Sequence, residues 1–151
     1  MSDAKISRTL YEQDILLWLE DTVAKLKAQD FAHLDIEHLI EEVEALGTSQ
    51  KKELLSRLVI LLEHLLKRIY IPSPNNCRGW ERTIRTQRVE LQLLLDAAPS
   101  LVTRWEASFE KAWRIALKTV CREYPTIAFP VTWPYGQAPE EILDRDFWLV
   151  P

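Results

Sequence analysis

Residues 54–70 read LLSRLVILLEHLLKRIY, and this leucine-dense stretch decides the fold class. Its apolar residues return every three or four positions, which is the pattern of a helix with one wide buried face. The expected core face consists of Leu54, Leu58, Leu61, Leu62, Leu65 and Ile69, widened by Leu55 and Leu66. Because so wide a face touches more than one neighbour, the stretch predicts a central helix, over residues 50–71, in an all-α bundle.

Further apolar patterns predict four more helices, at residues 9–29, 35–46, 80–98 and 100–124. Thr9 and Glu12 fit a capping box at the start of the first of these. Asp35 is a good N-cap for the second, and Gly47 is a natural stop for it because glycine accepts the left-handed conformation. The stripes expected to be buried on these two helices are Tyr11, Ile15, Trp18, Thr22 and Leu26, and then Ile36, Leu39, Ile40, Val43 and Leu46.

The last segment, residues 125–151, differs in composition from the rest. It holds five prolines and a dense set of aromatic residues, which make it too apolar for disorder. We expect an extended arm strapped across the bundle, with a short helical turn at 139–146. The fold prediction is therefore one all-α domain, residues 1–151: an antiparallel bundle of about five helices with an extended Pro/aromatic-rich C-terminal arm.

The composition restricts the setting in which the protein works. The net charge of −4 argues against a general affinity for nucleic acid. No apolar run is long enough to span a membrane, and the first ten residues lack the apolar core of a signal peptide. Cys77 and Cys121 match no zinc or redox spacing. We expect a cytoplasmic protein that does not associate with membranes.

Charge is nevertheless segregated along the chain. Residues 35–46 carry five acids and no Lys or Arg, whereas residues 67–88 carry six bases and one acid. On the predicted helix 80–98 and just before it, Arg78, Arg82 and Arg85 line one outer face at helical spacing. Such a stripe is usually a solvated face. The alternatives are contact with phosphate, or contact with an acidic surface such as that of residues 35–46, within a monomer or across a dimer.

His64 is the first candidate functional residue, because it is a lone histidine beside an apolar stripe. One interpretation is a semi-buried histidine that is hydrogen-bonded to a carboxylate of residues 35–46. The other is a ligand or proton-transfer residue, with Glu42 or Glu44 beside it. No metal site is expected, because no HxxxH or Glu-x-x-His pair is present and His33 and His38 lie elsewhere.

Thr83, Gln87 and Arg88 are the second candidate group. Gln87 lies within an apolar stripe, where its amide costs free energy unless it is hydrogen-bonded. The three side chains therefore belong either to a structural network inside the bundle or to a polar pocket that orients a small ligand. Nucleophile motifs and glycine-rich phosphate loops are absent, so no catalytic residue and no cofactor can be assigned.

Several short motifs, in this order along the chain, resemble those of a known family. They are Tyr11-Glu12, Asp14, Trp18-Leu19, Leu34-Asp35, Leu39-Ile40-Glu41-Glu42-Val43-Glu44, Leu46-Gly47, Leu61-Leu62-Glu63-His64-Leu65-Leu66-Lys67, Trp80, Thr83-Ile84, Gln87-Arg88, Pro99-Ser100-Leu101 and Asp146-Phe147-Trp148. Together they resemble the bacterial, largely cyanobacterial family called domain of unknown function 29. The resemblance implies a compact helical domain without an assigned activity. Where the family often has Cys before Pro-Tyr, this chain has Trp133.

Two functions remain open from the sequence, with a weaker third. The first is a non-enzymatic interaction or accessory domain that self-associates or binds a protein partner through its charged faces. The second is an enzyme or small-molecule binder whose site is lined by Glu42, His64, Thr83, Gln87 and Arg88. The third is nucleic-acid contact through Arg78, Arg82 and Arg85, which the acidic total disfavours.

Overall fold

The computed structural model describes residues 3–149, without the side chains of residues 3–5, 7 and 8. Every regular element in this range is helical, which confirms the predicted all-α class. The chain divides into two compact units, Met1–Ser49 and Gln50–Pro151, and each is described by itself. The expectation of a single domain stays a prediction. No described helix combines the length and apolarity that crossing a membrane requires.

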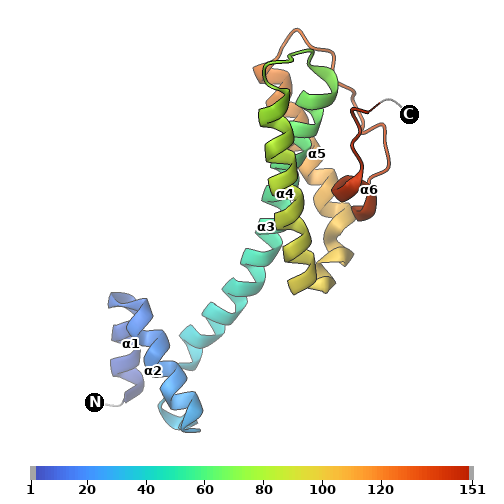
Figure 1. Cartoon of the computed structure of the whole chain (residues 1–151). Coiled ribbons are helices and arrows are strands. Elements are labelled where there is room, and N and C mark those ends of the chain that lie inside the picture. The colour runs from blue at the N-terminus through green and yellow to red at the C-terminus, as the bar shows by residue number, and fades with distance from the viewer. Residues whose placement is uncertain (1–2, 150–151) are drawn as a thin grey trace. The chain divides into compact units, whose positions relative to one another are not determined.

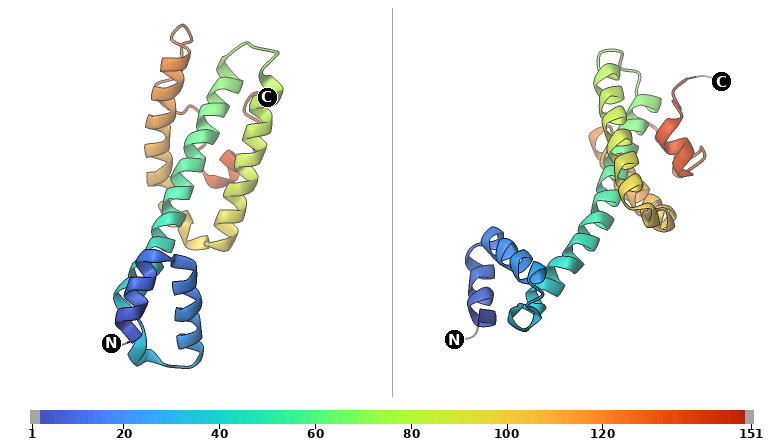
Figure 2. Two further views of the ribbon diagram at one scale, coloured as in Figure 1. Left: turned by 90° about the vertical axis from the view of Figure 1, so that its left-hand side faces the viewer. Right: turned by 60° about the horizontal axis from the view of Figure 1, so that its bottom comes forward.

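The first unit begins with two helices where one, at 9–29, was expected. They are α1 (Asp3–Gln13) and α2 (Ile15–Lys27), which lie side by side in Figure 2. Asp14 separates them because its backbone is extended, with φ −152° and ψ 94°. Its carboxylate accepts a hydrogen bond from the amide of Leu17 at 3.1 Å, so Asp14, and not Thr9, is the N-cap seen here.

The segment after α2 turns the chain into the third helix. Gln29 has a φ of 57°, the left-handed conformation that commonly follows a helix end. A short 3₁₀ turn, η1 (Phe31–His33), leads to Leu34 and Asp35, which are both buried. Asp35 accepts a hydrogen bond from the backbone amide of His38 at 3.4 Å and so caps the next helix, as expected.

That next helix, α3, runs without interruption over Ile36–Tyr70 and passes from the first unit into the second. The expected helices at 35–46 and 50–71 are therefore one helix, and the predicted stop at Gly47 is wrong. Gly47 has no positive φ, and a Cβ built on it would meet nothing within 4 Å. A glycine inside a helix costs only about 1 kcal/mol relative to alanine, and the helix formers around Gly47 outweigh that cost.

The second unit is a bundle formed by the later part of α3 with α4 (Cys77–Ala97) and α5 (Trp105–Glu123). Figures 1 and 2 show the three helices side by side in alternating directions. Six residues of the core face predicted for residues 54–70 are fully buried, namely Leu54, Leu58, Leu61, Leu62, Leu65 and Leu66, and the other two, Leu55 and Ile69, are half-buried against the same core. Twenty-one apolar residues are buried in the described part of this unit, up to residue 149, which makes it a well-packed body.

Two helix bounds differ from the predictions of 80–98 and 100–124. α4 begins at Cys77, directly after the Pro-Ser-Pro-Asn-Asn break at residues 72–76 and three residues before the predicted start at Trp80. Between α4 and α5 lies a separate 3₁₀ element, η2 (Pro99–Arg104). Pro99 has no backbone N–H and cannot continue α4, so the chain makes this tighter turn before α5 begins.

The arm after α5 crosses the bundle as predicted and contains one short helix, α6 (Pro139–Asp144). Indole N–H groups fix it: Trp105 donates to the carbonyl of Gln137 at 2.7 Å, and Trp113 to that of Val131 at 3.1 Å. Trp133 lies at the centre, with its ring centroid 5.1 to 6.2 Å from four other aromatic rings. These contacts explain why so aromatic a segment is ordered.

Candidate functional site

Among the residues predicted to line one polar site, the four that belong to the second unit, His64, Thr83, Gln87 and Arg88, do not hydrogen-bond to one another. Glu42 belongs to the first unit, and His64, Thr83, Gln87 and Arg88 belong to the second. Within the described residues, each of the five has a separate partner. A shared site around His64 therefore stays a prediction without a contact to support it.

His64 is half-buried on α3, and its ring is occupied by the helix itself. Nδ1 lies 2.7 Å from the carbonyl oxygen of Ile60, one turn earlier, so this nitrogen donates and carries the proton. Burial lowers the pKa of His64, partly opposed by this hydrogen bond. The ring is thus held neutral by its surroundings, and the hydrogen bond seen at Nδ1 goes to a backbone carbonyl, not to a carboxylate of residues 35–46.

Thr83 and Gln87 are satisfied in different ways. The Thr83 hydroxyl donates to the carbonyl of Gly79 at 3.2 Å, a bond inside its own helix. The amide oxygen of Gln87 accepts from the guanidinium of Arg57 at 3.2 Å, and Arg57 also pairs with Glu53 at 2.8 Å and Glu90 at 3.6 Å. Gln87 is therefore a tie between α3 and α4, which resolves the desolvation cost that the sequence indicated.

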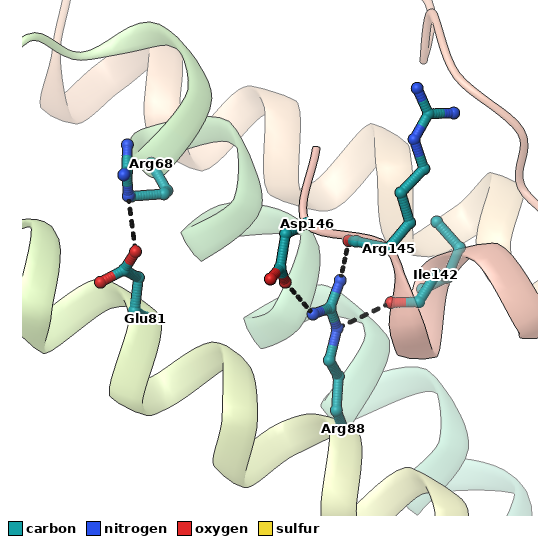
Figure 3. A network of polar contacts seen from close by, with 6 residues as sticks. All are labelled: Arg68, Glu81, Arg88, Ile142, Arg145 and Asp146. Carbon is teal, nitrogen blue, oxygen red and sulfur yellow. Dashed lines mark hydrogen bonds and ion pairs between the residues drawn. The ribbon is translucent and has the colours of Figure 1, made fainter. Parts of the chain in front are cut away.

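Arg88 fastens the C-terminal arm to α4 (Figure 3). Its Nε donates to the carbonyl of Ile142 at 3.0 Å, Nη1 meets the carboxylate of Asp146 at 3.0 Å, and Nη2 donates to the carbonyl of Arg145. The two carbonyls lie at the end of α6, where backbone acceptors lack helical partners and a cation is favoured. All three nitrogens of this guanidinium therefore bond to the arm, and Arg88 ties it to α4.

The predicted basic stripe is present and exposed. Arg78, Arg82 and Arg85 make no ion pair with any described residue. The same face of α4 continues at helical spacing into Val89 and Leu93, each 57% exposed. We call these five residues the α4 outer face. It combines three positive charges with exposed apolar surface, whereas the solvent-facing side of a helix is normally polar throughout.

The first unit holds a polar cluster that the sequence reasoning missed. The ring of Tyr11 stacks on that of His38, with centroids 3.9 Å apart, and its hydroxyl donates to Glu42 at 2.6 Å. Asp35, which is buried, meets Nδ1 of His38 at 2.5 Å. The spacing of Asp35 and His38, three apart at a helix start, was the signal available in the sequence. It is a capping arrangement that also orients an imidazole.

Neighbouring carboxylates favour the protonated forms of Tyr11 and His38 in this cluster. The hydrogen bond to Asp35 raises the pKa of His38. The hydrogen bond to Glu42 raises the pKa of Tyr11 to about 12. Tyr11 therefore keeps its proton and acts as a donor that ties α1 to α3. No group of three or more metal-ligating side chains occurs among the described residues.

The dominant feature of the first unit is uncovered apolar surface. Among the side chains described in this unit, Trp18 and Leu34 are the only buried apolar ones, whereas twelve large ones are 40–68% exposed. They include an α2 stripe, Leu16, Leu19, Val23 and Leu26, and an α3 stripe, Ile36, Ile40, Val43 and Leu46. Most of the stripe predicted to be buried on residues 35–46 is thus exposed, which corrects that expectation: periodicity shows that a face is apolar, not what covers it.

The two units also carry opposite charge. Met1–Ser49 holds eleven acids against four bases, a formal charge of −7, and Gln50–Pro151 holds twelve acids against fifteen bases, a charge of +3. Glu44 is exposed beside the α3 stripe, Glu41 is exposed one turn before Glu44, and neither makes an ion pair among the described residues. The α3 stripe is therefore an apolar face with an acidic border.

Two open hollows on the second unit lie away from the predicted residues. One, of about 650 Å³, lies between α4, η2 and α6 and is bordered by Asp96, Glu140 and Asp144. The other, of about 930 Å³, is lined by residues 68–74 and Cys77. Neither is lined by any of the five candidate site residues, so neither forms a site with His64 or Arg88.

Comparison with known proteins identifies a family but no activity. No curated protein and no solved structure matches the chain. One family model, described as "Domain of unknown function DUF29", matches residues 10–148. That match covers both units and nearly every residue that the structure describes. The chain therefore belongs to the DUF29 family, as the sequence motifs indicated.

Proposed function

We propose that the protein is a non-enzymatic interaction domain, in which the first unit binds another protein through the α2 and α3 stripes. The observation that carries the proposal is the exposure of twelve large apolar side chains on a unit with two buried ones. Contiguous apolar surface of this kind marks interaction sites in natural proteins. The spacing of both stripes, three or four residues at each step, is that of helices that pack against other helices.

The energetics of the first unit support this assignment. Burial of apolar side chains is the main term that offsets the conformational entropy lost on folding. Two buried apolar residues contribute only a few kcal/mol. Covering twelve side chains that are about half exposed would add on the order of 10 kcal/mol, since a fully buried one is worth about 1.5–3 kcal/mol. A partner would thus supply what the unit's own core lacks.

We place this activity in the bacterial cytoplasm. The resemblance of the motifs supports the bacterial source. The two cysteines support the compartment, because Cys77 and Cys121 are free thiols, which suit a reducing environment.

Binding of an environment-sensitive apolar dye to dilute protein tests the proposal. We expect strong fluorescence that falls markedly in Ile40→Gln/Val43→Gln, which makes the α3 stripe polar. The matched control is Val102→Gln/Val131→Gln, which alters two exposed apolar residues of the second unit and should leave the signal unchanged. A protein that binds no dye, or binds it equally after the change in the α3 stripe, would overturn the proposal.

A further inference from the structure

We propose that the partner of the first unit is a second copy of this chain, and that the surface it docks on is the α4 outer face. This inference rests on the proposed function, because it names the occupant of the same apolar stripes. It depends on the chemical match between two exposed surfaces, one from each unit.

The α4 outer face is the surface that fits a partner bordered by acids. Arg78, Arg82 and Arg85 follow one another at helical spacing, are exposed, and have no ion-pair partner among the described residues. Guanidinium groups pair well with carboxylates because their donors match carboxylate geometry. Val89 and Leu93 extend the same face by two turns with apolar surface, so charge and apolarity lie end to end on one helix.

The α3 stripe of the first unit has the complementary chemistry, apolar side chains with acids. Ile36, Ile40 and Val43 form an uncovered apolar line, exposed Glu44 adjoins it one turn after Ile40, and exposed Glu41 lies one turn before Glu44, on the side of the helix that also carries His38. Acids and apolar side chains thus lie side by side over about two turns. A face of this composition fits a basic, partly apolar helix better than it fits another acidic stripe.

The charge of the whole units selects the same pairing. Two first units, each at −7, would repel each other, whereas a first unit and a second unit at +3 attract. If the first unit of each copy docks on α4 of the other, both contacts form at once and the assembly closes as a two-fold dimer. Docking in this way covers apolar residues on both units and leaves neither charged face unpaired.

Charge reversal on each face, followed by mixing, tests the inference with the full-length chain. Light scattering should give about twice the monomer mass of 17.7 kDa at low salt, and a lower mass as salt is added. Arg82→Glu/Arg85→Glu should weaken the dimer about tenfold or more, and so should Glu41→Arg/Glu44→Arg. Mixing the two variants should restore the dimer mass, because each then meets a partner of opposite charge.

Matched variants separate this pairing from a general effect of charge. Arg114→Glu/Arg122→Glu and Glu106→Arg/Glu110→Arg make the same charge changes at exposed positions of α5 and should leave the dimer intact. A wild-type protein that is monomeric at every concentration would overturn the inference, and so would variants that stay dimeric or a mixture that stays monomeric. In any of these cases, a dye signal that still depends on Ile40 and Val43 would leave the proposed function standing.

Discussion

Replacing Arg88 by alanine should release the C-terminal arm and destabilise the second unit. In the folded chain its guanidinium reaches the carbonyl of Ile142 at 3.0 Å, the carbonyl of Arg145 and the carboxylate of Asp146 at 3.0 Å. The substitution removes the donors and leaves both carbonyls at the end of α6 without their partner. It does not touch the leucine core of α3, so the loss reports on the arm alone.

The magnitude follows from the individual bonds. A hydrogen bond from a charged donor contributes roughly 1.5 kcal/mol at the lower end of the usual range, so the two carbonyl bonds account for about 3 kcal/mol. The Asp146 side chain is 46% exposed, and a solvent-exposed ion pair adds at most about 1 kcal/mol. We therefore expect Arg88→Ala to lower the free energy of unfolding by about 3 kcal/mol, and Asp146→Ala by less than half of that.

Urea denaturation followed by circular dichroism measures this difference, and limited proteolysis shows whether residues 125–149 are cleaved first. Arg114→Ala is the matched control, because Arg114 is exposed on α5, lies outside the α4 outer face and makes no ion pair with a described residue. It should change stability by no more than about 0.5 kcal/mol. If Arg88→Ala and Arg114→Ala unfold at the same urea concentration, Arg88 does not hold the arm and the reasoning is refuted.

Three further changes test other parts of the structure. Gly47→Ala should raise stability by about 1 kcal/mol, since Gly47 is an exposed helical residue with open space around its Cα; a loss in urea unfolding would instead indicate a helix end there. Imidazole titration by NMR should place the pKa of His38 above, and that of His64 below, the usual value of 6.5. Protonated His38 then stabilises the fold at low pH until it deprotonates, whereas His64 destabilises the fold as the pH falls below 6.5. Midpoints in the reverse order, or a His38 midpoint unchanged by Asp35→Asn, would contradict the assignments. Trp133→Ala should cost about 3 kcal/mol by calorimetry, because four aromatic rings lose their common neighbour, and an unchanged melting temperature would remove Trp133 from the packing account.

Much of the second unit could be predicted from the sequence because the spacing of its apolar residues within each helix marks the face that is buried. The leucines of residues 54–70 repeat at helical spacing over five turns, and the face they define is the buried one. The aromatic and proline content of the arm indicated that it packs against the bundle and is not disordered. The partners of Arg88 could not be found this way, since Ile142 and Asp146 lie more than fifty residues away and no pattern links them.

The first unit was predicted less well, for two physical reasons. Local capping competes with periodicity: Asp14 breaks a stripe that looks continuous through Tyr11, Ile15 and Trp18, while Gly47 fails to break a helix. Apolar spacing also shows that a face must be covered without naming what covers it, so Ile40 and Val43 read as core although they are exposed. The sequence therefore located the helices better than it located the surfaces.

Hydrogen exchange of the full-length chain, measured by mass spectrometry at several protein concentrations, tests the central claim that the first unit is completed by another molecule. We expect peptides from residues 10–46 to exchange rapidly in dilute protein and to become protected as concentration rises. Peptides from residues 54–66 should stay protected throughout, because their leucines are buried within their own unit. Strong, concentration-independent protection of residues 10–46 in dilute monomer would contradict the account.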